Sequence, residues 1–321
     1  MKCTARAYAI QGLVKYHGLK NSKLRIPYHD SISVCMKSLS TVTTVEPDRS
    51  LHKDRIQING NVPTNREKAR ALIVVEKLRE IAGTKTFVRA ESRNSNVEGK
   101  GLGFSASGFA ALGLATSKAL GLDLEFRELS EIVRLGAGSA ARSLVGGFSI
   151  WYANRNGHSF AEQLAAASSM QFRTLIVPIP SKIKTDTIHP DAVTSPFFNA
   201  RLTYVKGALQ RMRWAIGRKD VSEICRIAEM DTLNLHAITM TGRQETVLFR
   251  PLSIRIIDEV RRLREDERIP CWYSLDTGPS VFINTKPAAA PKVEKTIRAL
   301  SDNLISSEPG GPAELIRRHI F

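Results

Sequence analysis

The sequence predicts an α+β fold with two lobes. Segments that resemble strands gather early in the chain and long helical segments gather late, which is typical of α+β proteins. With 321 residues, of which 42% are hydrophobic, the chain exceeds the size at which one core usually stops growing. We therefore expect an N-terminal lobe over residues 1–180 and a C-terminal lobe over residues 181–321.

The first lobe should begin with strands that lead into a helix. Residues 31–46 are rich in β-branched side chains and partly alternate, and residues 55–60 repeat the alternation before a turn. A helix should follow, because Thr64 or Asn65 can cap it and Gly83 can end it. The apolar residues expected on its buried face are Leu72, Val75, Leu78 and Ile81.

The same patterns predict the later elements. In the first lobe we expect helices over 105–120, 126–135 and 139–144, and strands over 148–152 and 172–178. In the second lobe we expect a loop over 187–195, helices over 197–217, 219–238, 252–265 and 289–303, and short strands over 273–276 and 280–283. The loop contains Pro190.

The charge of the chain points to an anionic partner. Its net charge of +16 favours capture of small anions in a basic cleft. Nucleic acid is the competing interpretation, but Lys and Arg are spread along the chain, and no zinc-finger or RRM-like aromatic motif is present. We therefore expect a small anionic ligand and no nucleic acid.

The N-terminus and the cysteines indicate a cytoplasmic protein. No apolar run of signal-peptide length follows Met1, and no run approaches the roughly 20 apolar residues of a membrane span. The four cysteines show no CxxC pairing, so neither a metal site nor a disulfide framework is indicated. We expect no membrane partner and four reduced, buried cysteines.

A glycine-rich segment over residues 99–103 leads directly into the helix predicted over 105–120. Backbone N–H groups of such a turn, together with the positive end of the following helix, form a site for phosphate. Close packing of a strand against a helix would require the same glycines, so this segment alone does not decide between the two roles.

A second glycine-rich segment, Gly136–Phe148, contains Arg142. Its small residues allow a ligand to approach the backbone, and the planar guanidinium suits a carboxylate or a phosphate. A surface role is the alternative for any arginine. Here the neighbours are small and apolar, where an unpaired guanidinium would be costly.

Two further charged residues interrupt apolar segments. Asp276 ends a strand-like run before the turn Thr277–Pro279, where it either caps the turn or carries chemistry. Lys15 interrupts the segment Gly12–Gly18, where it either extends to solvent or pairs with an acid.

In this order and at this spacing, these segments resemble those of the diphosphomevalonate decarboxylase family and its archaeal relatives. The matching segments are Val14–Gly18, Gly101–Ser107, Gly136–Phe148, Thr194–Pro196, Asp231 with His236 and Ala237, and Leu275–Pro279. The resemblance spans nearly the whole chain, and the arginine and aspartate segments are its specific parts.

The resemblance implies a GHMP-kinase fold, with the active site in the cleft between two α/β lobes, usually in a homodimer. It also implies that Asp276 and Lys15 lie together at the reacting carbon of a phosphorylated mevalonate, Lys15 orienting Asp276, and that Arg142 holds the substrate carboxylate. Further contacts to the substrate are expected from Tyr16, Lys100, Ser105, Ser107 and Ser139. In related mevalonate 3-kinases, which do not decarboxylate, the aspartate and lysine are replaced, so we expect bond cleavage here.

Departures from the family pattern bear on the nucleotide. Gly103 and Phe104 replace an Ala-Ser pair in the phosphate loop, and Lys100 replaces a small residue. These changes resemble the archaeal mevalonate 3,5-bisphosphate decarboxylases, which release isopentenyl phosphate, carbon dioxide and phosphate without ATP. We therefore expect no cofactor and no metal, and consider Lys182 and Lys184 for the 5-phosphate.

Two alternatives stay open at this point. One is a diphosphomevalonate or phosphomevalonate decarboxylase that uses ATP and Mg²⁺, with Asp276 as general base. The other is a basic protein that uses a similar lobe to bind RNA, or an enzyme relic without activity. The presence of Asp276, Lys15 and Arg142 together argues against the second alternative.

Overall fold

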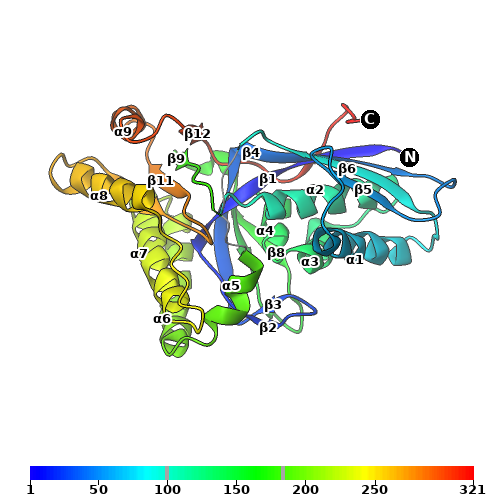
Figure 1. The fold of residues 1–321 in the computed structure, drawn as a ribbon, viewed down its shortest axis with the longest axis horizontal. Coiled ribbons are helices and arrows are strands. Elements are labelled where there is room, and N and C mark those ends of the chain that lie inside the picture. Colours follow the sequence, from blue (N-terminus) through cyan, green and yellow to red (C-terminus); the bar gives the residue numbers. More distant parts are fainter. Residues whose placement is uncertain (98–100, 182–184) are drawn as a thin grey trace.

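The structure, a computed structural model, describes residues 1–97, 101–181 and 185–321, and shows two lobes that meet along a central strand (Figure 1). This strand, β1 (Cys3–Val14), contacts α2 of the first lobe and α7 of the second. Because helices cover it, nearly all of its residues are buried, and it lacks the clean alternation of a solvent-facing strand. Lys15, the residue directly after this strand, therefore lies at the junction of the lobes.

Within the described residues, the first lobe is a seven-stranded sheet with helices along one face (Figure 1). The strand order is β13-β1-β4-β6-β5, and β7 joins β4 to β8. The other strands are β4 (Ser31–Pro47), β5 (Arg55–Ile58), β6 (Val88–Asn94), β7 (Phe148–Trp151), β8 (Ala161–Ala165) and β13 (Glu314–Leu315). The helices are α1 (Asn65–Ile81), α2 (Phe104–Ala119), α3 (Phe126–Gly136) and α4 (Ala140–Val145), and a small ribbon is formed by β2 (Leu19–Asn21) and β3 (Ile26–Pro27).

The second lobe contains an antiparallel sheet in the order β10-β11-β9-β12. Its strands are β9 (Arg173–Val177), β10 (Cys271–Ser274), β11 (Val281–Thr285) and β12 (Ile305–Ser307). The helices are α5 (Thr185–Ala192), α6 (Phe198–Gly217), α7 (Val221–Met240), α8 (Pro251–Glu265) and α9 (Ala290–Arg298), and a 3₁₀ turn, Ala167–Ser169, precedes β9. An apolar cluster joins the lobes by packing Leu13 and Val34 against Met212 and Ile224.

The helix predicted after residue 64 begins as expected, and its buried face agrees with the predicted one at Val75 and Leu78. Thr64 caps α1, and the Glu67 carboxylate accepts the Thr64 N–H in a capping box. The buried residues are Ala71, Val74, Val75 and Leu78. Continuing this stripe by four residues leads to Ala82, where the helix ends, so the expectation that Ile81 is buried is wrong; Ile81 is 44% exposed.

The loop predicted over 187–195 is wrong in its first part. Helix α5 continues to Ala192 and includes Pro190. Proline near the end of a short helix removes only one backbone hydrogen bond, and burial of Ile188 and His189 holds the helix against the protein. This helix matters because His189 lines the site described below.

The chain passes from the first sheet to the second shortly before residue 180. Strand β9 already pairs with β11 in the second sheet, so the chain changes sheets between β8 and β9. After β12 the chain returns, and β13 pairs with β1 in the first sheet. None of the helices in the described parts of the chain has the length and apolar character needed to cross a membrane. All four cysteines are free and buried.

Candidate active site

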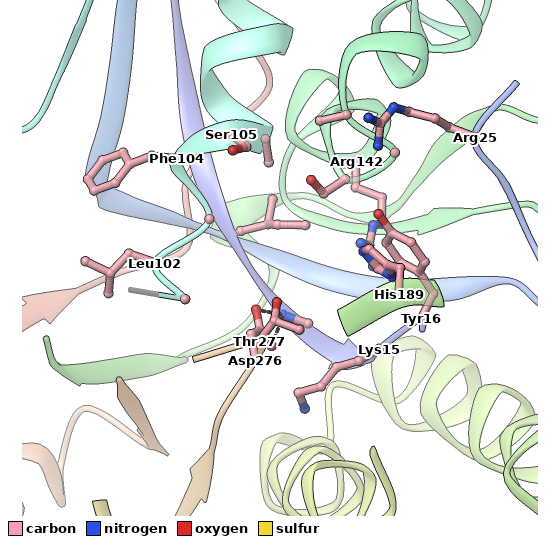
Figure 2. Close-up of a pocket in the computed structure, with 18 of the residues that line it drawn as sticks. Lys15, Tyr16, Arg25, Leu102, Phe104, Ser105, Arg142, His189, Asp276 and Thr277 are labelled. Carbon is pink, nitrogen blue, oxygen red and sulfur yellow. Dashed lines mark hydrogen bonds between the residues drawn. The ribbon is translucent and has the colours of Figure 1, made fainter. Parts of the chain in front are cut away.

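A cavity of about 450 Å³ lies where the lobes meet (Figure 2). Most of the residues predicted to contact substrate line it: Lys15, Tyr16, Ser105, Ser139, Arg142 and Asp276. Lys100, Lys182 and Lys184 lie outside the described residues. The end of β1, the start of α2, the segment before α4, helix α5 and the turn after β10 therefore contribute to one site.

Asp276 is held at the cavity by the backbone of β1. The N–H of Gly12 donates to both carboxylate oxygens, at 3.1 and 3.2 Å. A side chain at Gly12 would not fit, since a Cβ there would lie 2.6 Å from Lys15 Cγ and 3.1 Å from Asp276 Oδ1. Burial raises the pKa of Asp276 to about 6, while Lys15 and the Gly12 N–H oppose the rise. The carboxylate is thus ionised at neutral pH with a pKa suited to accepting a proton.

Lys15 is paired with an acid, but the acid is not Asp276. Its ammonium lies 3.8 Å from Asp231 Oδ2 and donates to Thr232 Oγ1 at 3.1 Å and to Ala228 O at 3.3 Å. Among the described residues no ion pair joins Lys15 to Asp276, and Lys15 acts on Asp276 through its charge. Burial lowers the pKa of Lys15, and Asp231 and Asp276 partly offset this.

A buried ion pair from the second lobe fixes the backbone of Lys15. Asp231 Oδ2 accepts the Lys15 N–H at 2.8 Å, and Arg201 Nη2 donates to the Lys15 carbonyl at 2.7 Å. The pair itself is closed by Arg201 Nη1 and Asp231 Oδ1 at 2.7 Å. Sequence reasoning matched Asp231 to a family segment without a role and missed Arg201. The available signal was an arginine within the apolar stripe of α6, next to Phe198 and Val205.

Arg142 is a buried cation with unused donors. Its side chain is 2% exposed, and in the described part of the chain its Nε and Nη1 have no hydrogen-bond partner. Burial lowers its pKa. An unsatisfied buried guanidinium is costly, and since Arg142 lines the cavity, an anionic ligand would satisfy it. The surface alternative for Arg142 is thereby excluded.

Aromatic rings build the wall beside Arg142. Tyr16 stacks on His189, with 5.0 Å between ring centroids, and meets the edge of Trp151 at 5.0 Å. The Arg142 guanidinium lies 5.7 Å from the Tyr16 ring (Figure 2). His189 was not predicted, because it lies in the segment taken as a loop. Ser139, before α4, completes this wall.

The glycine loop packs closely against β1, and the start of α2 that follows it faces the cavity. Gly101 and Gly103 have φ of +79° and +77°, and a Cβ on Gly103 would lie 2.6 Å from the Ile10 carbonyl. This close packing brings the start of α2 to the cavity. No side chain caps α2 within the described residues, so its first N–H groups are available to an anion.

The residues that open α2 differ in their access to the cavity. Ser105 is exposed on it, while the Phe104 ring packs partly against the cluster between the lobes and points away from Asp276 (Figure 2). Phe104 nevertheless also lines the cavity. Ser107 does not line the cavity; its hydroxyl is buried and shares a 2.7 Å hydrogen bond with Thr41. The structure thus contradicts the expected contact from Ser107.

Comparison with known proteins decides the family. Residues 7–161 match the model of the diphosphomevalonate decarboxylase-like N-terminal domain, and residues 183–308 match that of the mevalonate 5-diphosphate decarboxylase C-terminal domain. The chain belongs to the diphosphomevalonate decarboxylase family. A phosphomevalonate decarboxylase of Haloferax volcanii is 38% identical over 317 residues, which cover 98% of each chain. This relative and the chain are thus of nearly the same length.

Solved structures confirm the GHMP-kinase fold. The mevalonate diphosphate decarboxylase from Enterococcus faecalis has a TM-score of 0.90 at 29% identity and covers 99% of both chains. A complex of MDDEF with MVAPP, AMPPCP and magnesium has a TM-score of 0.91 at 28% identity, again over 99% of both chains. This diphosphomevalonate decarboxylase family member is therefore a mevalonate-pathway decarboxylase, a carboxy-lyase.

The prediction that no cofactor is used is wrong. A structural neighbour holds the ATP analogue AMPPCP together with magnesium, and the Enterococcus structure concerns ATP binding. The prediction rested on departures from the family pattern, among them Lys100 and the bulky Phe104, whose ring packs in part against the apolar cluster between the lobes.

Proposed function

We propose that this protein catalyses the ATP- and Mg²⁺-dependent decarboxylation of phosphomevalonate to isopentenyl phosphate, carbon dioxide, phosphate and ADP. The relative from Haloferax volcanii, named a phosphomevalonate decarboxylase, supports this substrate. The observation that carries the proposal is that one cavity holds the Gly12-bound carboxylate of Asp276, the unsatisfied guanidinium of Arg142 and the uncapped start of α2. Asp276 supplies a base, Arg142 supplies a cation that binds the substrate carboxylate, and the start of α2 supplies a phosphate site.

The residues at the start of α2 fit the phosphates of a nucleoside triphosphate. Gly101 and Gly103 allow the loop to pack against Gly278 and Ile10, which brings the start of α2 to the cavity, and Ser105 adds an exposed hydroxyl. ATP, when bound, supplies the phosphoryl group that turns the tertiary 3-hydroxyl into a leaving group. Mg²⁺ would enter with the nucleotide, since proteins commonly bind it through substrate phosphates.

Asp276 would act first as general base. Its carboxylate accepts the proton of the 3-hydroxyl, and its pKa of about 6 allows this at neutral pH. Asp276 then releases this proton to solvent and is a carboxylate again. When phosphate leaves with the electrons of its C–O bond, this carboxylate stabilises positive charge at the tertiary carbon. The electrons of the bond to the departing carbon dioxide then form the double bond of the product.

Arg142 and Lys15 would act through charge. Arg142 binds the substrate carboxylate and aligns the bond that breaks. Tyr16 and Ser139 line the same wall and limit the space beside the substrate. The ammonium of Lys15 is engaged by Asp231, so its contribution is electrostatic: it lowers the pKa of Asp276 and favours the ionised base.

Substrate comparison tests the proposal. The purified protein with Mg-ATP should release carbon dioxide from phosphomevalonate with a higher kcat/KM than from diphosphomevalonate, and neither should react when nucleotide is omitted. The second candidate is a diphosphomevalonate decarboxylase, favoured by both family models and by the Enterococcus structures. A higher kcat/KM for diphosphomevalonate would establish that candidate instead. Assembly as a homodimer stays a prediction that the mass in solution can test.

A further inference from the structure

Arg25 has a backbone conformation that a side chain rarely adopts. It lies in the turn between β2 and β3 with φ of +49°. The left-handed region costs an arginine about 1–2 kcal/mol, and such strain persists only where surrounding contacts impose it. The position holds an arginine, although a glycine would adopt this conformation without strain. The side chain of Arg25 therefore merits a functional explanation.

The end of α3 holds this turn by hydrogen bonds that run in both directions. Arg134 donates to the carbonyl of Leu24, and Arg25 Nε donates to the carbonyl of Leu135 at 3.0 Å. Within the turn, Asn21 Oδ1 accepts the Leu24 N–H at 2.9 Å. The backbone of the turn and the Nε of Arg25 are thus fixed before any ligand binds.

The rest of the guanidinium faces the cavity. Arg25 lines it, and no carboxylate among the described residues forms an ion pair with it. Figure 2 shows Arg25 beyond Arg142 as seen from Asp276. One nitrogen of the fork is therefore anchored to protein, while the terminal nitrogens remain for an anion.

We propose that Arg25 binds the 5-phosphate of the substrate and selects for a phosphorylated mevalonate, an inference that rests on the proposed function. The reacting carbon of phosphomevalonate carries two anionic arms, a carboxymethyl group and a phosphoethyl group. Four arginines line the cavity, Arg25, Arg66, Arg70 and Arg142. Figure 2 shows Arg25 and Arg142 together on the side away from Asp276. Arg142 takes the carboxylate, and Arg25 takes the phosphate with a pre-positioned fork.

Binding of two ligands that differ only in the phosphate tests this role. NMR titrations would measure the affinity of phosphomevalonate and of unphosphorylated mevalonate for the wild type and for Arg25→Asn. Asparagine tolerates the left-handed conformation, so the turn is kept while the guanidinium is lost. Loss of a charge-assisted contact should weaken phosphomevalonate binding by about 10- to 100-fold and leave mevalonate binding unchanged.

A matched control separates binding from backbone effects. Arg268 also has positive φ, +57°, but is exposed and away from the cavity, so Arg268→Asn should change neither affinity. Equal weakening of both ligands by Arg25→Asn, or no weakening, would overturn the proposal. Turnover distinguishes it from the proposed function: normal phosphomevalonate KM in Arg25→Asn removes only this inference, whereas phosphate-selective binding without any turnover in the wild type removes only the function.

Discussion

Lys15 and Asp231 form a buried ion pair, 3.8 Å from Nζ to Oδ2, that joins the end of β1 to α7. Asp231 also accepts the Lys15 N–H, and Arg201 donates to the Lys15 carbonyl. The second lobe thereby fixes the strand whose Gly12 N–H binds Asp276. The position of the base accordingly depends on contacts between the lobes as well as on the aspartate turn.

Replacing Asp276 by asparagine should remove turnover while preserving the fold. Asparagine can still accept the Gly12 N–H, but it neither accepts the proton nor carries negative charge. We expect kcat to fall by a factor on the order of 100 or more, as is common when preorganised charge is removed. Steady-state carbon dioxide release checks this, and near-normal turnover in the variant would show that Asp276 is not the base.

The same variant should be more stable than the wild type at alkaline pH. Burial raises the pKa of Asp276 from its ordinary value of 3.8 to about 6, so the ionised group destabilises the folded state above pH 6. This penalty, no more than about 3 kcal/mol, disappears as the pH falls below 4, where the group is protonated folded and unfolded alike. Thermal unfolding from pH 4 to 8 should show the two midpoints converging at acid pH; a constant difference would argue against the raised pKa.

As the pH falls below about 6, kcat should decrease. Protonated Asp276 cannot accept the hydroxyl proton, so kcat should fall about tenfold per unit on this limb. Because Lys15 lowers the pKa of Asp276, Lys15→Met should move the limb to higher pH. The pKa of the substrate phosphate would not change with that substitution. If the acidic limb of the profile stays at the same pH in Lys15→Met, it reports the substrate phosphate and not Asp276.

Replacing Arg142 by lysine should impair catalysis although the charge is kept. Lysine lacks the planar fork that binds a carboxylate with two parallel hydrogen bonds. We expect kcat/KM to fall at least tenfold, in line with the loss of a charge-assisted hydrogen bond. Arg155→Lys, at an exposed pair with Glu162, is the matched control and should leave kcat/KM unchanged. Equal behaviour of the two variants would place Arg142 outside the carboxylate site.

Substitution of Asp231 by asparagine should destabilise the protein strongly. It leaves the charges of Arg201 and Lys15 buried without their shared partner, which typically costs about 3–5 kcal/mol. Glu223→Gln, also on α7, breaks an exposed pair with Arg226 and should cost less than about 1 kcal/mol. Denaturant unfolding compares them; similar losses would mean that the buried pair is not a structural anchor.

Sequence reasoning identified the residues that share motifs and missed those defined by tertiary contact. Asp276 and Arg142 each interrupt a segment of small or apolar residues, and their roles follow from the resemblance to the diphosphomevalonate decarboxylase family. The Arg201 clamp and Arg25 were missed, since their roles depend on the packing of α6 onto β1 and of α3 onto the β2–β3 turn. Ser107 failed because helix geometry turns its hydroxyl toward Thr41.

Nucleotide use was predicted incorrectly for a related reason. The sequence shows that Phe104 follows the phosphate loop, but not the direction of its ring. That direction is set by the apolar cluster between the lobes, which takes up the ring. Domain limits were similarly hidden, since β13 returns to the first sheet only after the second lobe is complete.

The most direct test measures ADP and carbon dioxide in the same reaction, with phosphomevalonate and Mg-ATP as substrates. The proposed function predicts one ADP for each carbon dioxide, and neither product from Asp276→Asn. Carbon dioxide released without formation of ADP, or from a reaction lacking nucleotide, would contradict it.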